Sequence, residues 1–190
     1  MPRFFWNTAP FFIYRNNTNT LFNIIKMHRL IPVRYIPSSL TSKDARKQSK
    51  ELTHSRKSYK KGLYYTRRKI ASFKSKPSNH ITRARKIYKI EKIVPSKELS
   101  RKTGCSVSAL NQIVKKGEGA YFSSGSRPNQ TAQSWGYARL ASAITSGKSA
   151  AVDFDILEKG CNHRKPAYRM AVISRKKHGH GRRHTKRRQI

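Results

Sequence analysis

Residues 95–119, PSKELSRKTGCSVSALNQIVKKGEG, carry the clearest structural signal in the chain. Ser96 is placed to cap a short helix, and Gly104 to take the left-handed conformation that breaks it. Ser106 can then cap a second helix, for which Gly117 is the stop signal. The stretch therefore predicts a helix, a glycine turn and a second helix.

The spacing of small and aliphatic residues in this hairpin resembles that of a helix-turn-helix. If the second helix entered a DNA groove, its polar side chains would face the bases, since Asn and Gln pair with adenine and Lys with guanine or phosphate. A helical hairpin that merely packs has the same spacing, and such hairpins are common, so packing is the favoured interpretation. The candidate groove residues are Ser106, Ser108, Asn111, Gln112 and Lys115.

Further helices are expected on both sides of the hairpin. The first of them, KDARKQSKELTHSRKS, is too polar for a core-facing stripe, so it would need an external partner. The run LYYTRRKIASF (63–73) could be a strand, and AYFSS (120–124) a short strand or loop. The expected helices, with their caps, cover about residues 42–58, 78–90, 131–147 and 149–160.

The charge of the chain is large and unevenly distributed. Forty-three Lys and Arg against 8 Asp and Glu give a formal net charge of +35. The successive stretches 1–42, 43–104, 105–161 and 162–190 carry +5, +17, +2 and +11. A compact chain of this charge repels itself unless a polyanion or an acidic surface neutralises it. A binding partner is therefore implied.

Basic residues alternate with aromatic ones between Tyr59 and Phe73, an arrangement that could contact a phosphate backbone and stack on bases. The alternative, that these cations meet acidic faces of other proteins, stays open. The candidate polyanion-binding residues are Lys60, Lys61, Arg67, Arg68, Lys69, Arg182, Arg183, Lys186, Arg187 and Arg188, with Asn111, Gln112 and Lys115 of the hairpin.

The predicted fold is mainly α: a small helical domain that contains the helix-turn-helix-like hairpin, with extended basic arms at both ends. The expected segments are an aromatic and basic N-terminal arm (1–33), a basic extended and helical segment (34–77), the helical core (78–161) and a basic tail (162–190). Aromatic side chains are common interface anchors. In the first arm the candidate anchors for a partner protein are Phe4, Phe5, Trp6, Phe11, Phe12 and Tyr14.

No catalytic site, metal site, cofactor or small-molecule substrate is expected. Asp153 and Asp155 would point about 200° apart on a helix, so the simpler interpretation is that they keep the helix soluble or form a salt bridge with Arg139 or Lys148. Cys105 and Cys161 could pair, but no secretory signal is recognised, so two buried thiols are favoured. No apolar run of about 20 residues is present, so no transmembrane segment is expected.

The strings YIPSSLT (35–41), SSGSRPNQT (123–131) and SWGYARLASAI (134–144) point to a family. The chain resembles, over about residues 34–161, a basic domain of unknown function from large nucleocytoplasmic DNA viruses, which include the algal viruses. The resemblance implies a virion component and supplies no catalytic residues. Together with the charge, it predicts a non-enzymatic minor capsid protein on the inner side of the shell. The expected partners are major and minor capsid proteins, and viral DNA is a candidate partner. The alternatives are a DNA-binding protein that uses the helix-turn-helix and a ribosomal-type RNA-binding protein.

Overall fold

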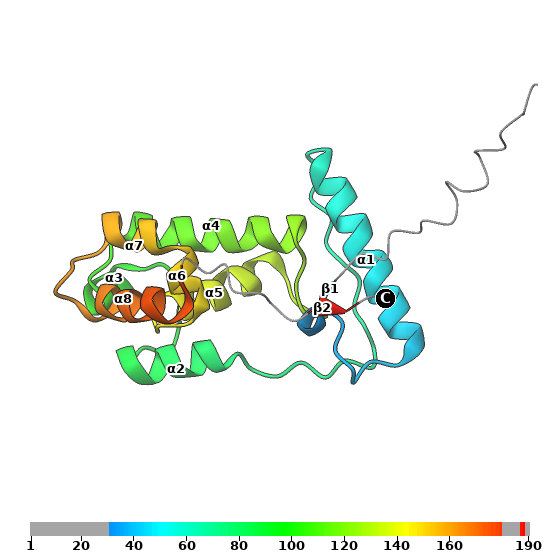
Figure 1. Ribbon diagram of the computed structural model, residues 1–190, viewed down its shortest axis with the longest axis horizontal. Coiled ribbons are helices and arrows are strands. Elements are labelled where there is room, and N and C mark those ends of the chain that lie inside the picture. Colours follow the sequence, from blue (N-terminus) through cyan, green and yellow to red (C-terminus); the bar gives the residue numbers. More distant parts are fainter. Residues whose placement is uncertain (1–30, 180–186, 189–190) are drawn as a thin grey trace, which may run out of the picture.

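The computed structural model describes residues 31–179 and the pair 187–188. Over these residues the protein is mainly α-helical and forms a small domain, as predicted (Figure 1). A short antiparallel pair joins β1 (Ile31–Pro32) to β2 (Arg187–Arg188), and a 3-10 turn, η1 (Val33–Tyr35), follows β1. The helices are α1 (Ser42–Lys60), α2 (Asn79–Tyr88), α3 (Lys97–Thr103), α4 (Val107–Ser123), α5 (Ala132–Ala143), α6 (Lys148–Val152), α7 (Phe154–Gly160) and α8 (Pro166–His178).

The predicted helix–glycine–helix hairpin is confirmed as α3 and α4. Ser96 Oγ accepts a hydrogen bond from the backbone N–H of Leu99, and Ser106 Oγ accepts one from that of Ala109, both at 3.1 Å. Gly104 ends α3 with a φ of 77°, a conformation that favours glycine. Local capping chemistry therefore sets both helix starts and the turn between them.

The stop signal read at Gly117 is wrong, because α4 continues to Ser123 and AYFSS is helical. A Cβ at Gly117 would lie 2.6 Å from the Cα of Gly136 in α5, so this glycine allows two helices to approach closely. α5 begins at the predicted cap, Thr131, whose Oγ1 accepts from the N–H of Ser134. The glycine pair explains why α4 and α5 form the most extensive helix contact of the fold.

The main hydrophobic core lies between α4 and α5 and the helices around them. Its largest fully buried side chains include Leu99 of α3, Leu110 and Ile113 of α4, and Leu140 of α5. Tyr88 of α2 is also buried there, and its hydroxyl donates to the carbonyl of Ile144 at 2.6 Å. Each helix of the hairpin thus serves as a packing surface.

The core extends past Cys161, where the basic tail was expected to begin. Pro166 occupies the first turn of α8, a position that suits its fixed φ. Ala167, Ala171 and Ser174 lie one turn apart and are buried, because α8 packs against α6 and α7. This contact is made by small side chains within a cationic sequence. For this reason the segment was predicted as part of the basic tail.

Cys105 and Cys161 form a disulfide, so the expectation of two free thiols is wrong. The backbone on either side of the bridge pairs as well. The N–H of Ser106 donates to the carbonyl of Gly160 at 2.8 Å, and the N–H of Asn162 donates to that of Gly104 at 2.7 Å. This long-range pairing holds the turn of the hairpin against the end of α7.

A second, smaller core packs against α1. The expectation that this helix needs an external partner is therefore wrong. Leu52 is fully buried against Tyr35, Ile36 and Ile70, and Trp135 of α5 packs on the edge of this cluster. Gln48 and Ser55 flank Leu52 on the same buried face. A few well-placed residues therefore suffice to attach a helix that is mostly polar.

Candidate nucleic-acid interface

Residues 61–78 contain no helix or strand, so the strand expected over 63–73 is absent. We call this segment the strap. Figure 1 shows it leaving the upper end of α1, descending beside that helix and then running along the lower edge of the molecule to α2. Side chains from other elements, in place of a neighbouring strand, bind its backbone. The strap carries four of the predicted polyanion-binding residues, Lys61, Arg67, Arg68 and Lys69.

Two carboxylates of α1 attach the strap. Glu51 Oε2 accepts hydrogen bonds of 2.9 Å from the hydroxyl of Tyr65 and from the backbone N–H of Arg68. Asp44 Oδ2 accepts one of 2.9 Å from the N–H of Ser72. Hydrogen bonds from the side chain and backbone of Ser72 lower the pKa of Asp44. Both carboxylates therefore have a structural use.

Asn129, in the SSGSRPNQT loop, holds the middle of the strap. Its Oδ1 accepts from the N–H of Ile70 at 2.8 Å, and its Nδ2 donates to the carbonyls of Ile70 and Phe73 at 3.0 Å each. The φ of Asn129 is 58°, a left-handed conformation that Asn tolerates better than most residues. One amide thus replaces the hydrogen bonds that a strand neighbour would supply.

Arg67 belongs to the strap's attachment and is not free to bind a polyanion. Its guanidinium carbon lies 3.6 Å from the centre of the Tyr121 ring. Its N–H groups donate to the carbonyl of Tyr121 at 2.8 Å, to Ser126 Oγ at 2.6 Å and to Ser55 Oγ at 3.1 Å. Burial lowers its pKa. Composition alone did not distinguish this arginine from its exposed neighbours.

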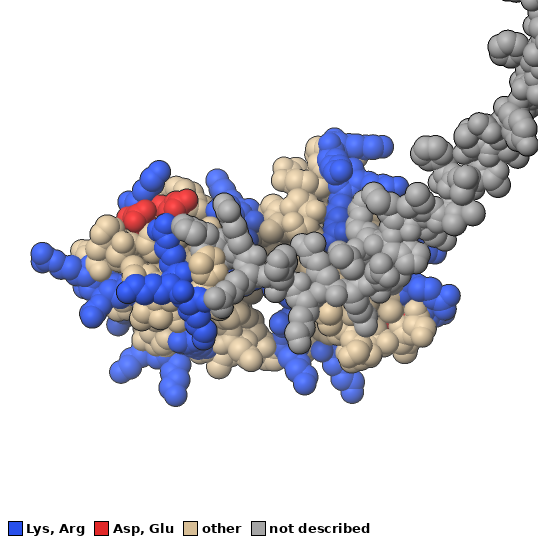
Figure 2. Space-filling model, in the orientation of Figure 1, with Lys and Arg blue, Asp and Glu red and all other residues tan. Residues whose placement is uncertain are grey.

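The other predicted residues of this region, Lys60, Lys61, Arg68 and Lys69, are exposed. Further exposed cations lie along the strap and on α2. They were not among the predicted site residues. For those of the predicted helix 78–90, positions off its apolar face were the signal. We call the whole group the cationic edge: Lys60, Lys61, Arg68, Lys69, Lys74, Lys76, Arg83, Arg85, Lys86 and Lys89. Figure 2 shows Lys and Arg side chains at the upper end of α1 and along the lower edge of the molecule.

The candidate groove residues Asn111, Gln112 and Lys115 lie on an exposed face of α4. Helix α7 runs beside the same half of α4, because the Ser106 N–H donates to the carbonyl of Gly160. The exposed carboxylates of Asp155 and Glu158 are on α7, and the acidic atoms visible in Figure 2 gather over this helix. Phosphates approaching α4 would meet this negative charge.

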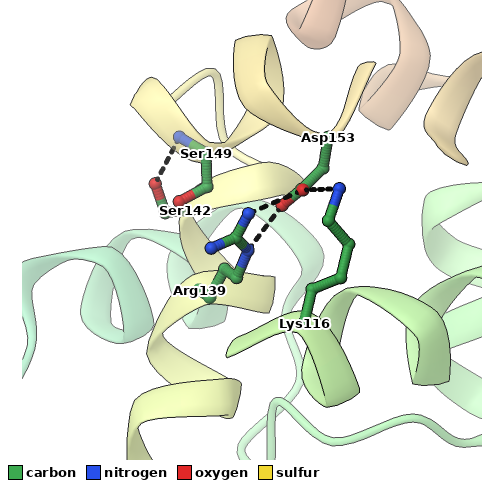
Figure 3. A network of polar contacts seen from close by, with 5 residues as sticks. All are labelled: Lys116, Arg139, Ser142, Ser149 and Asp153. Atoms are coloured by element: carbon green, nitrogen blue, oxygen red, sulfur yellow. Dashed lines mark hydrogen bonds and ion pairs between the residues drawn. The ribbon is translucent and has the colours of Figure 1, made fainter. Parts of the chain in front are cut away.

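Asp153, considered above as one of two paired carboxylates, is a fully buried structural anion (Figure 3). Its oxygens accept bonds of 2.7 Å each from Nε and Nη2 of Arg139, which confirms the predicted salt bridge with this residue. Lys116 of α4 adds an ion pair at 2.9 Å. The backbone breaks here between α6 and α7, so the single helix expected over 149–160 is two. Asp155 is exposed and takes no part.

Several predicted residues fall outside what the structure describes. These are the aromatic residues Phe4, Phe5, Trp6, Phe11, Phe12 and Tyr14 and the basic residues Arg182, Arg183 and Lys186, while Arg187 and Arg188 are described only as the backbone of β2. Among the described residues, no group of three or more His, Cys, Asp or Glu side chains could hold a metal ion. None of the helices in this part of the chain is long and apolar enough to cross a membrane.

A family model described as "Family of unknown function (DUF5824)" matches residues 32–159, which include the whole cationic edge and the main core up to α7. No curated protein and no solved structure matches the chain.

Proposed function

Because the chain belongs to this family of unknown function, we propose its function from its own surface: it is a non-enzymatic structural protein that binds the phosphate backbone of nucleic acid. The observation that carries the proposal is the cationic edge. Its ten side chains are exposed, whereas Asp44, Glu51 and Asp153 are already engaged inside the fold. Too few carboxylates therefore remain to neutralise the ten cations of this edge.

The physical gain from such binding is counterion release. Each phosphate that a Lys or Arg neutralises frees a condensed cation, and log K falls by roughly 0.9 per contact for each tenfold rise in salt. Neutralisation also removes the repulsion between cations that the fold holds close together along the strap and α2. Contacts to phosphate carry no sequence information, so such an edge suits binding that does not depend on base sequence.

The proposed setting is the virion of a large DNA virus, on the inner side of the capsid shell. The support is the resemblance of residues 34–161 to the basic domain of such viruses, together with the charge. There the protein would bridge capsid proteins and meet the genome through the cationic edge. Mass spectrometry of purified virions tests this setting, and detection only in the infected cell's virus factories would refute it. Co-sedimentation with ribosomes would instead support the ribosomal-type alternative.

The test of nucleic-acid binding measures the affinity for a fluorescent duplex of arbitrary sequence over a range of salt concentrations. Replacing Arg85 and Lys86 of α2 by Gln should lower the salt slope by about 0.9 for each lost contact. The matched control replaces Asn111 and Gln112 of α4 by Ala and should change neither slope nor affinity. If the α4 variant loses sequence discrimination while the α2 variant binds normally, the helix-turn-helix alternative replaces the proposal.

A further inference from the structure

The turn that follows α1 is fixed by the hydrogen bonds of a Schellman motif. The N–H of Gly62 donates to the carbonyl of Tyr59, and the N–H of Leu63 donates to that of Ser58, each at 3.0 Å. Gly62 has a φ of 78°, which this motif needs at its left-handed position. The backbone that carries Leu63 and Tyr64 therefore has a defined direction.

This motif presents apolar side chains to solvent. In most Schellman motifs the residue after the glycine packs back onto the last turn of the helix. Here Leu63 occupies that position and is 62% exposed, and Tyr64 is 73% exposed. These are the two most exposed large apolar side chains among the residues that the structure describes. The fold thus leaves an apolar surface open at the end of α1.

Tyr64 is supported by two other rings. Its ring centre lies 5.1 Å from that of Phe122 in α4 and 6.0 Å from that of Tyr59 in α1, both in edge-to-face geometry. Tyr59 and Phe122 are nearly parallel, at 6.2 Å. We call these three residues the aromatic cluster. Because two helices hold the supporting rings, the exposed ring costs little conformational entropy when a ligand stacks on it.

Three exposed cations lie near the aromatic cluster in the sequence. Lys57 and Lys60 lie on the last turn of α1, Lys61 follows directly, and all three are exposed. The space beside Gly62 is open, since no atom outside Gly62 and its two chain neighbours lies within 4 Å of the position that a Cβ would take. The site therefore offers exposed ring surface and positive charge within a few residues. A ligand that matches the rings has flat groups free to stack on them, and a ligand that matches the cations has an anionic backbone. A strand of unpaired bases has both.

We propose that the aromatic cluster is a stacking site for the bases of single-stranded nucleic acid, whose phosphates bind Lys57, Lys60 and Lys61. This proposal rests on the proposed function and names its ligand. A duplex keeps its bases inside the stack and offers only phosphates to this surface. Single strands expose the faces of their bases, and stacking on aromatic side chains accepts any base.

The experiment compares Tyr64→Leu with Tyr64→Phe in the full chain. A short oligothymidine and an abasic sugar-phosphate strand of the same length serve as probes. Stacking of one base predicts a loss of about tenfold in oligothymidine affinity for Y64L, and little loss for Y64F, which keeps a ring. Affinity for the abasic strand and for a duplex should not change. Ile173→Ala, at an exposed apolar residue of α8, is the control for the loss of surface apolar area.

A second measurement locates the base. Photo-cross-linking of an oligonucleotide that contains 5-iodouracil should modify Tyr64, Tyr59 or Phe122, as identified by mass spectrometry of peptides. If Y64L binds oligothymidine as the unmodified protein does, and no cross-link falls in the aromatic cluster, the stacking site is refuted while phosphate binding stands. If the unmodified protein binds none of the strands in a salt-dependent way, the proposed function itself fails.

Discussion

At the scale of single residues, the fold uses its few carboxylates as internal attachment points. Asp153 is the most demanding case, because its charge is fully buried and joins Arg139 of α5 to Lys116 of α4. Removing its charge leaves the guanidinium of Arg139, whose side chain is only 19% exposed, without its carboxylate partner. The cost is then much larger than that of losing a surface ion pair.

Asp153→Asn should therefore lower the free energy of unfolding by about 3 kcal/mol or more. Urea denaturation followed by far-UV circular dichroism measures it. Asp155→Asn is the matched control, since it changes the net charge equally but at an exposed position, and should stay within about 0.5 kcal/mol. Equal destabilisation by both variants would mean that net charge, and not the buried ion pairs, sets the stability.

At the scale of elements, the strap depends on hydrogen bonds from residues far away in the sequence. Asn129→Asp keeps the size of the side chain but replaces the amide group that donates to the carbonyls of Ile70 and Phe73. Losing these donors should speed hydrogen exchange at the Ile70 amide about tenfold or more, because the strap opens locally at lower cost. NMR-detected exchange measures it.

The control for this variant is Asn111→Asp, the same replacement on the exposed face of α4. It should leave the Ile70 amide unchanged. Exchange at the amide of Leu110, in the main core, should be slow in both variants, since α4 does not depend on the strap's hydrogen bonds. If the Ile70 amide exchanged equally fast in the Asn129→Asp variant and in the unmodified protein, the hydrophobic contacts of Ile70 alone would hold the segment.

The same elements show how far the sequence could predict this fold. The caps at Ser96 and Ser106 and the turn at Gly104 were predictable, since each depends on atoms within a few residues. α8 was missed because its contact uses alanines among lysines and arginines. The strap was misread as a strand because side chains of other elements bind its backbone, among them that of Asn129, which lies 59 residues from Ile70 in the sequence. Arg67 was misassigned because charge does not reveal burial.

At the scale of the whole molecule, the length of α4 decides how the two cores are joined. Its first half carries Leu110 and Ile113 into the main core, and its last turns carry Tyr121 and Phe122 to the strap and α1. Ser55 Oγ of α1 donates to the carbonyl of Phe122 at 3.4 Å. Had Gly117 ended the helix, the aromatic cluster would lack one of its three rings.

The disulfide acts on this whole arrangement, because the loop between Cys105 and Cys161 contains α4, α5, α6 and α7. A cross-link over a separation of 56 residues restricts the unfolded chain by about 4 kcal/mol in the loop-entropy model. Replacing both cysteines by Ser should lower the free energy of unfolding by about 2–4 kcal/mol in urea, and a reductant should do the same to the unmodified protein but not to the variant. Disulfides persist in oxidising surroundings such as released virions. If the proposed virion setting holds, protein extracted from virions under alkylating conditions should therefore retain unmodified, paired cysteines, and quantitative alkylation of both would contradict the bridge in that setting.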